Sequence, residues 1–246
     1  MRSGNRMIKK WFEKLREKWV NIPAGITTRR NSKELLQLDD RELITLWSDI
    51  QRECINEISV RGWYYILYGD ILKNKNVLDV GSGLGIDAFT FAKMGVKITC
   101  LDIVEANIKL LKRITSLLEL SNVKFFYLDD IDDLNKLPYE YDIIWCQGSL
   151  LNMPFQIARQ ESLKLLEHLK NGGRWIELAY PKSRWIKEGM MPFDKWGEKT
   201  DGGAPWIEWY DINKLLKRLE PHKFKVILNF EFHKGDFIWF DLLKIE

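Results

Sequence analysis

A glycine-rich segment between an apolar run and an amphipathic run is the feature that most limits how this chain can fold. Residues 77–80 are apolar except for Asp79, and they lead directly into Gly81, Gly83 and Gly85. Glycine is required where the backbone turns tightly or where a ligand lies directly against it. The segment therefore predicts a strand, a ligand-binding turn and a helix in succession.

From Asn76 onward, short apolar runs alternate with longer helical patterns. The expected strands are residues 77–80, 96–101, 123–128, 142–146 and 175–179, and the expected helices are residues 86–93, 105–118 and 155–169. This alternation predicts an α/β fold with a mostly parallel sheet covered on both faces. Two later runs, 224–232 and 237–243, are joined through Gly235 and predict an antiparallel hairpin.

The residues before Asn76 follow a helical pattern, so residues 1–75 are expected to form a helical N-terminal extension or lid. The first helix has an apolar stripe of Ile8, Trp11, Phe12, Leu15 and Trp19, with Lys and Arg between them. The second should begin at Asp39 or Asp40, with Asp40 as N-cap, and a third should cover residues 63–72.

Residues 76–246 are expected to form the ligand-binding domain, and a long connection interrupts it. The connection, residues 181–208, is rich in Trp, Pro, Gly and charge and is expected to be an insertion without regular structure. Loops of this length are uncommon unless they are functional or disordered, and the aromatic content argues against disorder. Gly172 and Gly173 predict a helix stop before the last parallel strand.

Composition and charge exclude several classes of protein. Hydrophobic residues make up 46% of the 246 residues, and the net charge of +3 is too small to argue for a nucleic-acid partner. The three cysteines show no metal-binding or disulfide spacing, so we expect no metal and a cytoplasmic location. A basic helix with Trp and Phe is of the kind that lies on an acidic membrane surface, so a peripheral membrane contact stays open; the alternative is that its apolar stripe packs on its own domain, which is more common.

Two carboxylates and the glycine spacing define the ligand. The pattern is GxGxG, and Ile86 stands where a dinucleotide-binding motif would require Gly or Ala, which argues against a nicotinamide dehydrogenase. Asp79 ends an apolar strand and must have partners there. Asp102 ends the next strand, where a carboxylate can accept hydrogen bonds from ribose hydroxyls; the alternative is a helix N-cap.

On these residues, the segment from about 76 to 180 resembles the core of the class I S-adenosylmethionine (SAM) dependent methyltransferases. The resemblance implies a Rossmann-like fold with a seven-stranded, mostly parallel sheet and a C-terminal antiparallel hairpin. It implies SAM as cofactor and S-adenosylhomocysteine as product. Many relatives carry His where Asn152 stands, and this departure leaves the role of Asn152 open.

The resemblance also implies a set of cofactor contacts. By this resemblance, the methionine part of SAM lies on the glycine loop, with Asp79, Gly81, Ser82, Gly83 and Gly85. Asp102 is the ribose-binding acid, with Ile103 beside it, and Asp129 or Asp130 is the acid near the adenine amino group. Gln147 and Gly148, after the fourth strand, complete the cofactor contacts. Asp129 and Asp130 compete for the adenine side, with the spacing slightly in favour of Asp129.

The insertion supplies the candidate acceptor residues. Asp201 and Glu208 are the candidate catalytic bases, because a hydroxyl nucleophile needs a proton acceptor. The candidate substrate-binding residues are aromatic or basic side chains: Arg184, Trp196, Trp206, Trp209 and Tyr210. Alternating aromatic and charged groups suit a polar ring such as a sugar, and the alternative is that the tryptophans simply pack the insertion onto the sheet.

The sequence therefore predicts a SAM-dependent methyltransferase that O-methylates a small-molecule or surface-glycan sugar acceptor. Two other functions remain open: a SAM-binding, non-catalytic or regulatory module, and an RNA or DNA methyltransferase.

Overall fold

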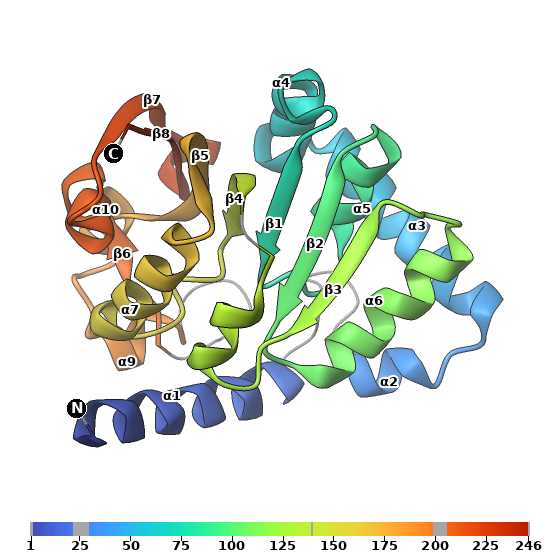
Figure 1. Ribbon diagram of the computed structural model, residues 1–246, viewed down its shortest axis with the longest axis horizontal. Coiled ribbons are helices and arrows are strands. Elements are labelled where there is room, and N and C mark those ends of the chain that lie inside the picture. Colours follow the sequence, from blue (N-terminus) through green and yellow to red (C-terminus); the bar gives the residue numbers. More distant parts are fainter. Residues whose placement is uncertain (1, 22–29, 139, 199–205, 246) are drawn as a thin grey trace. The chain divides into compact units, whose positions relative to one another are not determined.

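The computed structural model describes residues 2–21, 30–138, 140–198 and 206–245 (Figure 1). The chain divides into two compact units, Arg16–Leu128 and a second made of Met1–Leu15 with Asp129–Glu246. The first unit takes residues from both sides of Asn76, so much of the expected N-terminal extension packs in the same unit as the glycine loop. The role of residues 1–75 as a lid stays a prediction.

The strands of the unit Arg16–Leu128 are parallel, as predicted. They are β1 (Asn76–Val80), β2 (Lys97–Asp102) and β3 (Val123–Tyr127), in the order β3-β2-β1. Val80 pairs with Leu101 at the carboxyl ends of β1 and β2. This register brings the loop that follows β1 beside Asp102, the last residue of β2.

The helices of this unit come from both sides of β1 in the sequence. They are α2 (Ser32–Leu36), α3 (Asp40–Asn56), the π-helical turn η1 (Ile58–Gly62), α4 (Trp63–Leu72), α5 (Ile86–Lys93) and α6 (Glu105–Leu117). Their buried faces are mostly apolar, with Trp47, Phe89 and Leu110 at most 1% exposed, although Gln51 and Asp87 are also buried. Arg113 of α6 donates to Asp40 at 2.8 Å and to the Leu38 carbonyl at 2.7 Å, which holds α6 against the start of α3.

The prediction that Asp40 caps α3 is wrong by one residue. Asp39 has extended backbone angles, and its carboxylate accepts a hydrogen bond from the Glu42 N–H at 2.8 Å. The Glu42 carboxylate accepts in return from the Asp39 N–H at 3.2 Å. Only Asp39 can take part in this reciprocal capping box, because Glu42 then stands three residues later.

The second unit combines parallel and antiparallel strands. Its strands are β4 (Tyr141–Gln147), β5 (Leu169–Pro181), β6 (Trp209–Tyr210), β7 (Phe224–Phe232) and β8 (Phe237–Lys244). β5 pairs in parallel with β4 and β6, and it pairs antiparallel with β8, which completes the predicted hairpin with β7. The two-residue strand β6 was not predicted, because a run this short has no detectable periodicity.

Helices connect these strands. They are the first part of α1 (Arg2–Asn21), the 3-10 helix η2 (Ile131–Lys136), α7 (Phe155–Leu166), α8 (Lys182–Lys187), α9 (Phe193–Trp196), α10 (Ile212–Leu219) and the 3-10 helix η4 (His233–Gly235). The α10 helix is capped by Asp211, whose carboxylate accepts from the Lys214 N–H at 2.8 Å.

The prediction that Gly172 and Gly173 stop a helix is wrong, because both residues lie inside β5. The pairing of β4 with β5 shifts register between Tyr141 and Ile143, which leaves extra residues on the β5 side. Gly172 has a left-handed φ of 76°, and a Cβ on Gly173 would lie 2.6 Å from Leu169 Cδ1. The two glycines therefore allow a β-bulge in β5. A glycine pair in a sequence is compatible with a bulge as well as with a helix end, which is why the prediction failed.

The expectation that residues 181–208 have no regular structure is also wrong where the structure describes them. They contain α8 and α9, and Trp196 is fully buried. Trp11 of α1 makes edge-to-face contacts with Phe193 and Trp206, at ring-centroid distances of 6.4 and 5.4 Å. Packing of aromatic rings therefore orders much of this segment.

The apolar stripe of α1 faces inward. Ile8 is 7% exposed, and Phe12 and Leu15 are each 1% exposed. Among the helices that the structure describes, none is long and apolar enough to cross a membrane. The peripheral membrane contact and the cytoplasmic location both stay predictions.

A buried carboxyl on α7 predicts how stability depends on pH. Burial raises the pKa of Glu161 from 4.5 to about 7, and the nearby Arg218 only partly opposes this. The folded state therefore holds a proton that the unfolded chain releases between these values, so stability should fall as pH rises from 4.5 to 7. Glu161→Gln should be more stable than wild type at pH 8, by up to roughly 3 kcal/mol, with a much smaller gain at pH 4.5.

Thermal unfolding at pH 4.5 and 8 checks this, with the exposed Glu167→Gln as the matched control. An equal gain at both pH values would show that the charge of Glu161 is not the cause.

Candidate functional site

The glycine loop between β1 and α5 has the backbone conformation that its sequence requires. Gly81, Gly83 and Gly85 have φ angles of 76°, 52° and 69°, in the left-handed region that side chains disfavour. The N–H groups of Gly81 and Ser82 donate to the Leu101 carbonyl at 2.8 and 3.2 Å. The loop is thereby fixed to the end of β2.

Asp102 is the main side-chain support of this loop. Its Oδ2 accepts from the Gly83 N–H and from the Asn107 amide, both at 3.0 Å, and its Oδ1 accepts from the Val104 N–H at 2.8 Å. Burial raises the pKa of Asp102 although these hydrogen bonds favour the charged form. Val104 occupies the N-cap of α6, so the helix-cap alternative for Asp102 is wrong.

Asp79 lies beneath the loop. It is 5% exposed, and burial raises the pKa of its carboxyl to about 7. The Ser82 hydroxyl donates to the Asp79 carbonyl at 3.0 Å, which ties the loop to the end of β1. The neighbouring Ile103, also a predicted cofactor contact, is half-buried.

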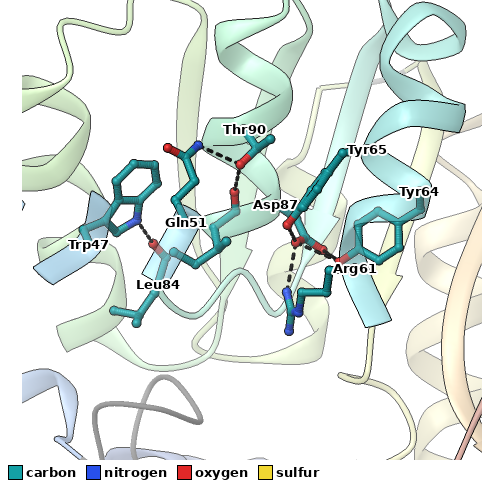
Figure 2. A network of polar contacts seen from close by, with 9 residues as sticks. Trp47, Gln51, Arg61, Tyr64, Tyr65, Leu84, Asp87 and Thr90 are labelled. Atoms are coloured by element: carbon teal, nitrogen blue, oxygen red, sulfur yellow. Dashed lines mark hydrogen bonds and ion pairs between the residues drawn. The ribbon is translucent and has the colours of Figure 1, made fainter. Parts of the chain in front are cut away.

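A second support of the loop comes from the segment before β1 (Figure 2). The Trp47 indole N–H of α3 donates to the carbonyl of Leu84, inside the loop, at 2.9 Å. Asp87, on the first turn of α5, accepts hydrogen bonds from Arg61 at 2.9 Å, from Tyr64 at 3.0 Å and from Tyr65 at 2.5 Å. Sequence reasoning missed these groups; the one available signal was an acidic residue in the otherwise apolar start of a helix.

In the other unit, the last residue of β4 and the loop after it contain buried polar groups without hydrogen-bond partners among the described residues. Neither the oxygen nor the nitrogen of the Gln147 amide has a hydrogen-bond partner among the described residues, and the same holds for the Ser149 hydroxyl. Gly148 has a φ of 72°, with nothing within 4 Å of an added Cβ. The Asn152 amide donates to the Gly148 carbonyl at 2.5 Å, so Asn152 holds the loop. Unsatisfied buried groups cost free energy unless a ligand or water completes them.

The two candidate acids after β3 differ in what they bind. Asp130 is the N-cap of η2: its carboxylate accepts from the Asp132 N–H at 3.0 Å. Its own N–H donates to Asp133 at 3.0 Å. Asp129, by contrast, is exposed. The Asp130 carboxylate is therefore already engaged in capping η2.

Glu208 lies in a cluster of charged and aromatic side chains around β6. Its carboxylate accepts from the Lys214 ammonium at 2.5 Å, and partial burial lowers the pKa of Lys214. The same ammonium lies 3.7 Å from the centre of the Trp209 ring. Trp185 stacks on Trp209 at 5.4 Å, and the Lys182 ammonium lies 5.1 Å from that ring. The other candidate base, Asp201, lies outside the described residues.

The remaining predicted acceptor residues are mostly engaged within the protein. Arg184 is 8% exposed and donates to Glu188 at 2.9 Å and to the Asp236 carbonyl at 3.2 Å. Trp196 and Tyr210 are fully buried, and the Trp196 N–H donates to Glu188 at 2.5 Å. Trp206 is half-buried. Their role in acceptor binding stays a prediction.

A buried ion pair supports the strand β6, and sequence reasoning missed it. Arg218 of α10 and Glu177 of β5 are at most 1% exposed and form a salt bridge. The Trp175 N–H donates to the same Glu177 oxygen at 2.8 Å, and the Arg218 guanidinium lies 4.7 Å from the Tyr210 ring centre. This contact packs Tyr210, next to Trp209, against the core.

Comparison with known proteins identifies the class of this domain. Residues 71–184 match a family model described as a methyltransferase domain. The match contains the glycine loop and Asp102 described above. These residues form a class I SAM-dependent methyltransferase domain, which confirms the predicted family and its SAM cofactor.

The individual relatives agree with this class. A ubiquinone biosynthesis O-methyltransferase from Nitrosospira multiformis is 28% identical over 147 residues, which cover 58% of this chain. The chain spans 59% of the length of that relative.

Solved structures share the fold. A SAM-dependent methyltransferase from Aquifex aeolicus is 18% identical with a TM-score of 0.57, covering 85% of this chain and 100% of its own. The magnesium protoporphyrin IX methyltransferase of Synechocystis PCC 6803, solved with S-adenosylhomocysteine, is 19% identical with a TM-score of 0.54, covering 84% and 87%. The predicted α/β, Rossmann-like fold class is confirmed.

The crowding at Gly85 predicts a specific loss of stability. A Cβ on Gly85 would lie 2.6 Å from Leu111 and 2.9 Å from Phe89, in addition to the strain of a φ of 69°. Gly95 has a φ of 90° but nothing within 4 Å of an added Cβ, so it is the matched control. Gly85→Ala should destabilise by about 2–4 kcal/mol and Gly95→Ala by about 1–2 kcal/mol, since only the first adds overpacking. Urea unfolding measures both, and equal losses would contradict the crowding.

Proposed function

We propose that this chain is a SAM-dependent methyltransferase that transfers a methyl group to a hydroxyl of a small-molecule acceptor, with a sugar as the first candidate. The observation that carries the proposal is the loop of three left-handed glycines fixed by Asp102. The loop exposes Gly81 and half-exposes Gly83, so the backbone is open to a ligand. The family match supports the cofactor.

The residues present fit SAM. In the unit Arg16–Leu128, we assign Gly81, Ser82, Gly83 and Gly85 to the methionine part, with Asp79 as support of the loop. We assign Asp102 to the ribose hydroxyls and its neighbour Ile103 to a further cofactor contact. In the other unit, Asp129 is preferred over Asp130 for the adenine amino group, because Asp130 is occupied with capping η2.

The loop after β4 supplies two further contacts, Gln147 and Gly148. The unpartnered amide of Gln147 is the group that most needs a ligand, because both of its polar atoms are buried.

When bound, SAM supplies an activated methyl group on a sulfonium, so the protein has little covalent chemistry to perform. The chain must hold the acceptor oxygen in line with that methyl group, and such positioning can supply most of the acceleration. A hydroxyl acceptor must also lose its proton. We assign this step to Glu208, whose carboxylate is oriented by a hydrogen bond from Lys214 and can accept the proton.

Side chains around β6 indicate the class of acceptor. The cluster of Trp185, Trp209, Lys182 and Lys214 combines half-buried rings with charged groups, which suits a polar ring-shaped acceptor such as a sugar. A phenolic acceptor is the second candidate, because curated relatives are named ubiquinone biosynthesis O-methyltransferases. A non-catalytic SAM-binding module would share the cofactor loop but not the transfer.

Substitution of Asp102 tests the cofactor site. Asp102→Asn should weaken S-adenosylhomocysteine binding by about 10–100-fold, because hydrogen bonds to a charged group are worth roughly 1.5–3 kcal/mol. Isothermal titration calorimetry measures this, with the exposed Glu105→Gln on the next turn as control and NADH as the competing ligand class. Equal affinity of Asp102→Asn and wild type would remove Asp102 from the site, and tighter binding of NADH would overturn the cofactor.

Methyl transfer to a panel of acceptors tests the reaction. We expect labelled methyl groups from SAM to appear on sugars or nucleotide sugars before phenols, and Glu208→Gln to lower kcat by about 100-fold or more as expected for loss of a general base. The exposed Glu167→Gln is the control. Transfer only to phenols would favour the second candidate, and S-adenosylhomocysteine binding without transfer would favour the non-catalytic module.

A further inference from the structure

The Asp87 carboxylate accepts hydrogen bonds from three side chains that precede the methyltransferase core in the sequence. Asp87 is 6% exposed, and it accepts from Arg61, Tyr64 and Tyr65, which lie within five consecutive positions of η1 and α4. Figure 2 shows these donors converging on the one carboxylate. All three donors lie before residue 71, where the family match begins.

This carboxylate lies at the point where the cofactor loop becomes a helix. Asp87 is two residues after Gly85, the N-cap of α5, and it carries the negative charge of the first turn of that helix. A carboxylate there is favoured by the helix dipole. A single residue separates Asp87 from Gly85, where the packing is tight: a Cβ added to Gly85 would lie 2.6 Å from Leu111 and 2.9 Å from Phe89.

A second set of contacts holds the same loop and helix from α3. Trp47, which is 1% exposed, donates to the Leu84 carbonyl within the loop. One turn after Trp47 on α3, the Gln51 amide nitrogen donates to the hydroxyl of Thr90 on α5 at 2.8 Å. The Gln51 amide oxygen accepts from the Lys93 ammonium, also on α5, at 2.9 Å. The loop is thus fixed at Leu84 from α3 and at Gly83 from Asp102.

Buried polar contacts around Asp87 contribute little to the free energy of unfolding, so we ask whether they instead fix the position of the loop backbone. Burying a carboxylate with a guanidinium and two phenols gives little net stability compared with apolar side chains of similar volume. Directional hydrogen bonds, in contrast, fix a backbone position, and ligand sites tolerate errors of only about 0.5 Å.

We propose that Asp87 is a positioning residue for the cofactor, and that Arg61, Tyr64 and Tyr65 act through it to hold the SAM-binding loop in its ligand-ready geometry. The inference rests on the proposed SAM site. It makes residues 58–65 part of the cofactor site rather than a separate extension, although none of these side chains is assigned a contact with SAM.

Titration calorimetry with S-adenosylhomocysteine distinguishes positioning from simple stability. Asp87→Asn keeps the size of the side chain but places an amide against three donors, and it should raise the Kd by tenfold or more with a stoichiometry near one. Tyr65→Phe, which removes one donor, should raise the Kd by a smaller factor of about 3–5. A purely structural role would instead lower the stoichiometry, because fewer molecules would be folded, and leave the Kd of the folded fraction unchanged.

Two controls complete the experiment. Val96→Ala shortens a fully buried side chain just before β2, at the opposite end of that strand from the loop, so it should lower Tm without changing the Kd. Asp49→Asn removes an exposed carboxylate of α3 and should change neither. Wild-type binding with a Kd for Asp87→Asn within twofold of wild type would overturn the inference and leave the proposed function standing. No binding by wild type would instead overturn the proposed function.

Discussion

The hydrogen bond from the Gly83 N–H to the Asp102 carboxylate connects the two strands on which the cofactor site is built. The parallel register of β1 and β2 places their carboxyl ends side by side, and the loop after one strand then meets the last residue of the other. Three successive left-handed glycines make this close approach sterically possible. Without the register the carboxylate would not reach the loop, and without the glycines the loop could not turn back toward it.

The glycine loop is supported by Asp102 on one side and by Asp87 with its donors on the other, and only the first support could be predicted from the sequence. Asp102 could be predicted, because it follows a strand at the edge where parallel strands end. Asp87 could not, because its meaning depends on Arg61, Tyr64 and Tyr65, and nothing local links these residues to a carboxylate more than twenty positions later. Long-range partners of buried charges are set by packing of whole helices, which periodicity does not specify.

The same distinction explains which parts of the fold were predicted. Apolar runs located the parallel strands to within a few residues, because burial leaves a continuous apolar signal. The terminal hairpin was located by two β-rich runs on either side of Gly235, although β7 is largely exposed. The exception was the start of β5, where Gly172 and Gly173 were assigned to a helix end. The predicted loop at 181–208 contained two short helices, since their order comes from rings such as Trp11 and Trp196 that pack from elsewhere.

The contacts of α3, η1 and α4 with α5 have a consequence for where this protein can be cut. The alternation of strands and helices begins at Asn76, and the family match begins at residue 71, so either position is a natural choice for truncation. A chain starting there would expose the apolar surface of α5 that Trp47 and Tyr65 cover, and would return Asp87 to water. We therefore expect a piece that folds with an intact glycine loop to begin before α3, although the matched residues 71–184 lie entirely after it.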